Sequence, residues 1–208
     1  MLQRDRSIQE LAQVLMRLSA RRRAVQAFLS VERALHYVAD VSTEEQIRSA
    51  REAIDASLWS TLGGSALRDS DAIYESLVQS CEPETDRAFP VIEAIASAIA
   101  LSCRVSPAEW TAEHGLGVAE HVDATIVAWR RQGTRDRAEL GTELALAYDS
   151  PPVLRERRRS LIDARHLLGA TETQSELDVA RTLSIGVDDV VVGARAPPSA
   201  WLPWRGRV

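Results

Sequence analysis

Two residues that can bind ligands, Glu32 and His36, lie four positions apart in a stretch with helical periodicity. Side chains at this spacing are neighbours on a helix. At 100° per residue both fall inside the apolar arc around Phe28 and Leu29, so we expect them to face inward. Such a pair can bind a ligand or a metal ion, or it can form an ion pair or hydrogen bond that ties the core together. The sequence leaves both interpretations open.

Two further histidines, His114 and His121, share an apolar helix face with Trp110 and Val118. They are two turns apart, about 10 Å along the helix axis, which is too far for both to bind one ion from a straight helix. A single histidine on such a face is typically a hydrogen-bonded core residue. Two of them strengthen the case for a ligand site.

A third candidate, Glu93, lies in the first turn of segment 91–104, which is apolar on nearly all sides and therefore typical of a central helix. The helix dipole stabilises a carboxylate there. If Glu93 is buried it needs a partner, because an isolated buried charge is costly, and Arg33 is one candidate. The hypothesis that follows is an interior ligand pocket formed by Glu32, His36, Glu93 and one of His114 and His121.

The motifs of common catalytic sites are not found: there is no nucleophile elbow, P-loop, dinucleotide-binding loop or zinc-protease motif. We therefore expect no catalytic residue, no metal and no cofactor. Asp163 and His166 have the spacing of a bundle metal motif, but the other ligands of such a site cannot be assembled. Two groups of arginines are expected to form solvated helix faces: Arg21, Arg22 and Arg23, and Arg155, Arg157, Arg158 and Arg159.

Helix signals dominate the elements that would position these residues. Ser42 with Glu45 as a capping box, and Ser106 followed by Pro107 and Glu109, are the clearest helix starts. Only segment 190–192 has the pattern of a strand. We predict an all-α fold: a single compact multi-helix domain of seven or eight helices over 1–193, with a short extended Pro/Trp-rich C-terminal tail over 194–208. The expected helices cover 7–39 with a break near 21–23, 43–62, 71–80, 91–104, 107–132 with kink positions at Gly115 and Gly117, 136–148, 153–168 and 171–183.

The composition narrows the class of protein. The 208 residues include 30 alanines and 25 basic residues, all of them arginine, and no lysine or asparagine, which is typical of a GC-rich bacterial genome. The net charge of −5 argues against nucleic-acid binding. Cys81 and Cys103 match no redox motif and are expected to be small buried residues. No signal peptide or membrane span is expected, since the longest weakly polar segment, 90–103, is too short to cross a bilayer. We expect a cytoplasmic protein.

Three segments carry a family resemblance: 28–33 (Phe-Leu-Ser-Val-Glu-Arg), 54–62 (Ile-Asp-Ala-Ser-Leu-Trp-Ser-Thr-Leu) and 89–98, which begins Phe-Pro-Val-Ile-Glu-Ala. In order and spacing they resemble the YjaG-like bacterial family of unknown function, a group of small all-helical cytoplasmic proteins. The resemblance covers 25–185 and implies an all-α fold without an established activity. It singles out Glu32, Arg33, Trp59, Pro90 and Glu93, the last in place of an aspartate.

Three functional hypotheses remain. The first is a non-enzymatic cytoplasmic protein that binds a protein partner, as a regulator or an immunity-type protein; the acidic net charge would steer it to a basic partner, and Trp201 and Trp204 would be candidate anchors. The second is an enzyme or binder of a small ligand or metal that uses the Glu/His pocket. The third is a homo-oligomer that packs through its alanine-rich helices.

Overall fold

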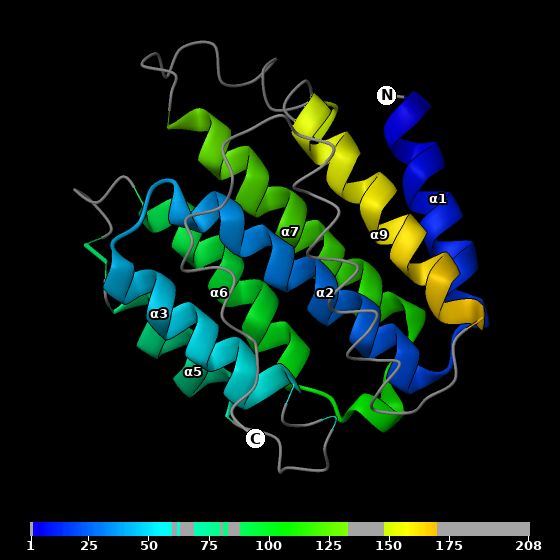
Figure 1. Cartoon of the computed structure of the whole chain (residues 1–208), viewed down its shortest axis with the longest axis horizontal. Helices are drawn as coiled ribbons and strands as arrows, with labels where there is room; N and C mark the ends of the chain where they lie inside the picture. Colours follow the sequence, from blue (N-terminus) through cyan, green and yellow to red (C-terminus); the bar gives the residue numbers. More distant parts are fainter. Residues whose placement is uncertain are drawn as a thin grey trace, which may run out of the picture.

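The computed structural model shows an all-α fold, as predicted (Figure 1). It describes residues 2–59, 62, 69–79, 81–82, 88–132 and 148–169. The elements of this part of the chain are α1 (Leu2–Arg17), α2 (Ala20–Ala39), α3 (Glu44–Ala53), the π-helical turn η1 (Ile54–Trp59), α5 (Ser70–Val78), α6 (Phe89–Cys103), the 3₁₀ turn η2 (Pro107–Glu109), α7 (Ala112–Arg131) and α9 (Pro151–Gly169).

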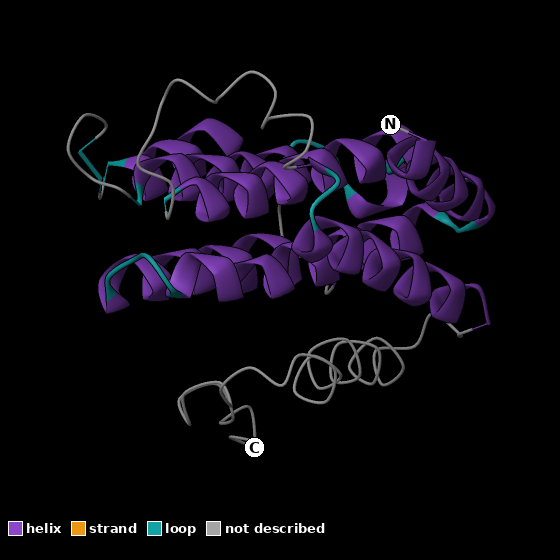
Figure 2. Cartoon of the chain, turned by 90° about the horizontal axis from the view of Figure 1, so that it is seen from above, coloured by secondary structure: helices purple, strands orange, loops and turns teal. Residues whose placement is uncertain are grey.

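The helices form two layers (Figure 2). The long helix α2 packs against α6, α7 and α9, and α6 also packs against α5 and α7. At the other end of the molecule α1 and α9 run side by side (Figure 1). Buried apolar side chains come from every one of these α-helices, so α2 is covered on most of its circumference. None of the described helices is long and apolar enough to cross a membrane.

The first two helices separate slightly earlier than the sequence predicts. The break lies at Leu18 and Ser19, and the Ser19 side chain accepts a hydrogen bond from the backbone N–H of Arg22 at 3.3 Å. The arginines expected to interrupt the helix instead form its first turn. Arg23 donates to the backbone oxygens of Leu15 at 2.7 Å and Trp110 at 2.8 Å, so this run joins backbone segments rather than forming a solvated face.

The capping box before α3 is displaced by one residue from the predicted one. Thr43, not Ser42, accepts a hydrogen bond from the backbone of Gln46, and the Gln46 side chain accepts one from the backbone N–H of Thr43. The predicted partner Glu45 is exposed. A glutamine at the third helical position satisfies the same orphan donor as a glutamate.

The predicted helix 107–132 is wrong at its start. Ser106 caps only the short turn η2, and the chain then leaves the helical conformation at Trp110. The indole of Trp110 is 1% exposed, and its N–H donates to the backbone oxygen of Val105 at 3.1 Å. Helix α7 begins after Thr111, with its own capping box, and continues without a break through the two expected kink positions at Gly115 and Gly117. Burial of the tryptophan therefore overrides the strong helix-start signal.

The remaining predictions fall partly outside the described residues. Cys81 and Cys103 are buried and not disulfide-bonded, as expected. The expected helices 136–148 and 171–183, the segment 190–192 and the tail 194–208 with Trp201 and Trp204 lie outside the described residues, apart from Tyr148.

Candidate functional site

The structure does not place Glu32 and His36 in the core. His36 is exposed, and Glu32 is half-buried at the α3 side of α2, where its charge raises the pKa of Arg51 against the stronger lowering effect of burial. The prediction that both face inward is therefore wrong. Gln26, Ser30 and Arg33 are buried in place of this pair, because α9 covers a polar side of α2 that the apolar pattern does not reveal.

His114 has a structural contact. Its Nδ1 accepts a hydrogen bond from the backbone N–H of Thr111 at 3.1 Å and so completes the capping box of α7. Its ring also lies 6.0 Å from that of Trp110, measured between centroids. These contacts hold the start of α7 against the buried indole.

Glu93 is exposed, and its expected partner Arg33 binds other residues. The Tyr74 hydroxyl of α5 donates to the Glu93 carboxylate at 3.5 Å. Burial and the nearby negative charge of Glu93 raise the pKa of Tyr74, so the phenol stays protonated and remains a donor. Glu93 therefore needs no buried cation.

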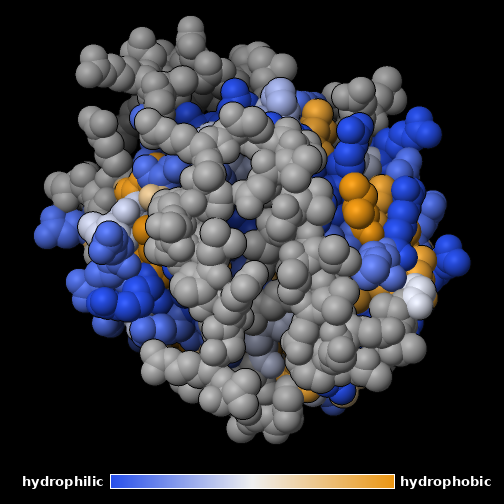
Figure 3. Space-filling model, viewed as in Figure 1, coloured by the Kyte–Doolittle hydropathy of each residue, from blue (hydrophilic) through white to orange (hydrophobic). Residues whose placement is uncertain are grey.

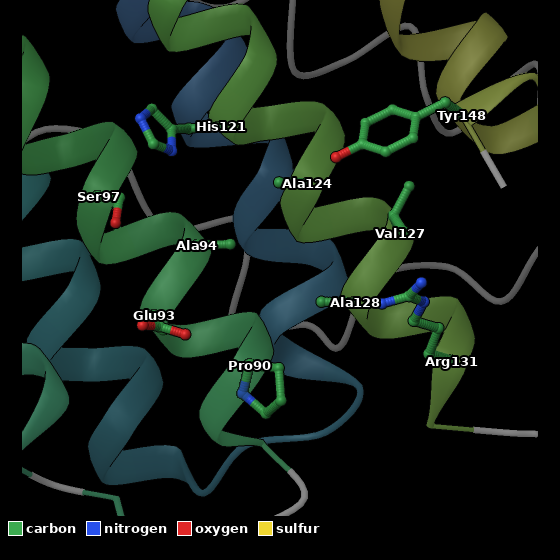
Figure 4. A pocket seen from close by; sticks show the side chains of 10 residues that line it. All are labelled: Pro90, Glu93, Ala94, Ser97, His121, Ala124, Val127, Ala128, Arg131 and Tyr148. Atoms are coloured by element: carbon green, nitrogen blue, oxygen red, sulfur yellow. The ribbon is translucent and has the colours of Figure 1, made fainter. Parts of the chain in front are cut away.

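Two of the five candidate ligand residues, Glu93 and His121, line the same hollow, which we call the α6/α7 cleft (Figure 4). Its volume is about 300 Å³, at the lower end of the range for small-molecule sites. Glu32, His36 and His114 are not among its lining residues. The full lining is Pro90, Glu93, Ala94, Ser97, His121, Ala124, Val127, Ala128, Arg131 and Tyr148.

The hollow has an apolar floor and polar groups at its sides. Alanines of both helices lie at its centre, and Figure 4 shows Glu93 and Ser97 on one side of them with Arg131 and Tyr148 on the other. Because alanine ends at Cβ, the floor leaves space that larger side chains would fill. The cleft can therefore receive an apolar body between groups of opposite charge.

His121 lies at the Ser97 side of this cleft and is half-buried. Burial lowers its pKa, nearby Glu120 raises it, and Arg104 lowers it further, with burial the largest effect. The imidazole is therefore neutral at pH 7 and offers one N–H donor and one lone pair. A neutral imidazole can hydrogen-bond a ligand without adding charge to the cleft.

Among the described residues, the largest group of buried charges lies elsewhere, between α2 and α9, and sequence analysis did not predict it. The guanidinium of Arg33 donates through Nε to both oxygens of Glu156, at 3.1 and 3.2 Å, and through Nη1 to Asp163. Ser30 and Ser160 hydrogen-bond to each other at 2.8 Å beside it. All five residues are less than 9% exposed. We call them the Arg33 network.

A second buried ion pair joins α9 to α7. Arg157 donates through Nε and Nη2 to one oxygen of Asp123, at 2.8 and 2.6 Å. Arg157 is 4% exposed, so the prediction that its arginine run is a solvated face is wrong for this residue. Arg159 is also largely covered, and its Nε lies 3.6 Å from Asp163. Helical periodicity explains the split, since Arg155 and Arg158 of the same run are exposed.

These charges bind one another rather than a ligand. Three arginines (Arg33, Arg157 and Arg159) meet three carboxylates (Glu156, Asp163 and Asp123), so the formal charges cancel. The spacing of Asp163 and His166 carries no metal site here, because Asp163 pairs with arginine and His166 is exposed. Within the described ranges, no three His, Cys, Asp or Glu residues are grouped to hold a metal ion. One sequence signal was available: Glu156, Ser160 and Asp163 follow helical spacing on one face of α9.

In comparisons with known proteins, the chain matches no family model, no curated protein and no solved structure. The resemblance to the YjaG-like family stays a prediction.

Proposed function

We propose that this chain is a non-enzymatic, cytoplasmic bacterial protein, a regulator or an immunity-type protein, that binds a protein partner through the outer surface of α1 and α9. We call this surface the α1/α9 face. Its members are the exposed residues Arg6, Met16, Arg17, Arg155, Arg158, Ile162, Arg165 and His166.

The observation that carries the proposal is the exposure of two large hydrophobic side chains, one on each of the two packed helices. Met16 is 62% exposed and Ile162 is 48% exposed, more than any other large hydrophobic residue of the described chain. They belong to neighbouring helices, and Figure 3 shows hydrophobic atoms among hydrophilic ones on that side of the molecule. Exposed apolar residues within a polar rim are typical of interaction surfaces.

The rim of this face is positively charged. The side chains of Arg155 and Arg158 make no hydrogen bond or ion pair with another residue of the described ranges. Arginine is enriched at protein interfaces, where its fork of donors binds carboxylates. The net charge of the chain is nevertheless −5, so the positive charge is a local feature of this face. It favours an acidic partner surface, in place of the basic partner that the net charge alone suggests.

A pull-down with the tagged full-length chain from a native bacterial lysate tests the proposal. We expect the wild-type chain to recover one acidic protein in stoichiometric amount. The variants Ile162→Glu and Arg158→Glu should not recover it, because both substitutions lie on the α1/α9 face. Arg48→Glu on α3 is the matched control, since Arg48 is exposed and lies outside this face. Recovery of no stoichiometric protein, or equal loss from the control, would contradict the proposal. A dimer in light scattering that Ile162→Glu dissolves would identify the partner as a second copy.

A second candidate function is supported by the α6/α7 cleft. Two residues of the predicted Glu/His pocket, Glu93 and His121, line it together, which favours a small-ligand site. Ligand-detected NMR with a mixture of small polar molecules tests this function, with Ala124→Leu as the variant that fills the cleft. Signals that are the same for both proteins would argue against a ligand site.

A further inference from the structure

The charged groups of the α6/α7 cleft are separated across its apolar floor. Glu93 extends from α6 on one side, and Arg131 extends from the end of α7 on the other (Figure 4). Ala94, Ala124 and Ala128 lie between them. A ligand that reaches both charged groups must therefore cross an apolar surface.

Each side has hydrogen-bonding groups that fit its charge. Ser97 and the neutral imidazole of His121 lie on the Glu93 side, where they can accept hydrogen bonds from a cation. The Tyr148 ring points towards α7 on the Arg131 side, where its hydroxyl and the guanidinium can donate to an anion. The two sides thus favour ligand ends of opposite charge.

We propose that the α6/α7 cleft binds a small zwitterion whose ammonium and carboxylate groups are separated by a short aliphatic chain. The ammonium lies at Glu93 and Ser97, the carboxylate at Arg131 and Tyr148, and the methylene groups rest on the alanine floor. The proposal rests on the second candidate function, the small-ligand site, and adds the class of ligand. It is independent of the α1/α9 face.

The charge pattern also explains why neither half of such a molecule suffices. A carboxylate without an ammonium brings one more negative charge towards Glu93, and an amine without a carboxylate brings one more positive charge towards Arg131. A zwitterion with both charges on one carbon atom can reach one side of the cleft only. The four types of molecule should therefore differ in affinity.

Isothermal titration of the full-length chain with four probes tests these differences: ω-aminohexanoate, its isomer leucine, hexanoate and hexylamine. We expect ω-aminohexanoate to bind at least about tenfold more tightly than the other three, because each of those can make charged contacts on one side of the cleft only. In Glu93→Gln its advantage over hexanoate should fall to about threefold or less. The side-chain carbonyl of glutamine can still accept from Tyr74, so the local structure is kept.

Ala124→Leu fills the floor and should abolish binding of ω-aminohexanoate. Ala72→Leu on α5 is the matched control, since Ala72 is exposed outside the cleft, and it should bind as the wild type does. If hexanoate or leucine binds as tightly as ω-aminohexanoate, and Ala124→Leu still abolishes binding, the ligand site stands and the zwitterion proposal is overturned. If none of the four probes binds, the zwitterion proposal is overturned, and the NMR comparison decides the ligand site. If Ala124→Leu has no effect on binding, both are overturned.

Discussion

Replacing Arg33 with methionine should destabilise the fold strongly, because the guanidinium is the centre of a buried network. Arg33 is 5% exposed and binds Glu156 and Asp163, which are themselves 7% and 6% exposed. Methionine has a similar length and fills much of the same space. The substitution therefore leaves two carboxylates buried without their main partner, while the packing volume changes little.

The size of the effect follows from what remains around each carboxylate. Removing one member of a buried ion pair costs about 3–5 kcal/mol. Asp163 keeps Arg159, whose Nε lies 3.6 Å away, and Glu156 keeps the hydroxyl of Ser160 at 3.3 Å. We therefore expect a loss near the middle of that range, about 4 kcal/mol, rather than twice the value for one pair. This is a large part of the roughly 5–15 kcal/mol that stabilises a typical domain.

Urea denaturation followed by circular dichroism measures this loss. Arg158→Met is the matched control on α9: the same substitution at an exposed position should change the free energy of unfolding by less than about 0.5 kcal/mol. The triple variant Arg33→Met, Glu156→Met, Asp163→Leu removes all three charges and should be more stable than Arg33→Met alone. A loss below about 1 kcal/mol for Arg33→Met, or a triple variant less stable than the single one, would refute the reasoning.

Three further predictions test the start, the packing and the titration of α7. Thr111→Ala removes its capping box and should cost about 1 kcal/mol of unfolding free energy in urea denaturation, and an unchanged midpoint would contradict the cap. Gly117→Ala should stabilise the fold by up to about 1 kcal/mol, because the added Cβ meets only the flexible end of the half-buried Leu101 side chain. Gly115→Ala should lack this gain, because its Cβ would lie 3.1 Å from the fully buried Leu15 side chain. Equal shifts in melting temperature for the two variants would contradict this distinction. Burial lowers the pKa of His121 in the folded state, so the unfolded chain is protonated first and stability should fall as the pH drops below about 6.5. His121→Gln should make this fall smaller when the free energies of unfolding in urea are compared at about pH 5 and pH 7. An unchanged pH dependence would contradict the prediction.

The sequence was sufficient to predict the all-α fold and most described helices, because caps and apolar periodicity are local signals. The start of α7 shows the limit of such signals. Ser106 does cap a helical turn, but burying the Trp110 indole against the core requires the chain to leave that turn. The choice between one helix and two is therefore made by a tertiary contact, which local capping rules do not contain.

The candidate sites show the same limit at the level of single residues. Helical phase gives the direction of a side chain but not the element that covers that direction. On α2 it placed Glu32 and His36 inside an apolar arc, but α9 covers the opposite polar side, so Arg33 is buried and His36 is not. Glu93 and His121 could be singled out as polar residues near apolar faces. Their meeting in one cleft depends on how α6 packs against α7, which the sequence pattern does not show.

Helix α9 shows why a chain whose basic residues are all arginine can use one run for two purposes. Arginine remains charged when buried but can satisfy several acceptors at once, so Arg157 is held inside by Asp123. Arg155 lies two positions before Arg157 and Arg158 one position after it. The helical turn between these positions leaves Arg155 and Arg158 exposed while Arg157 is buried. The inner side of α9 attaches it to α2 and α7, and its outer side is the proposed binding face. Substitutions at Arg158 should therefore change partner binding without changing stability, whereas substitutions at Arg157 should change stability first.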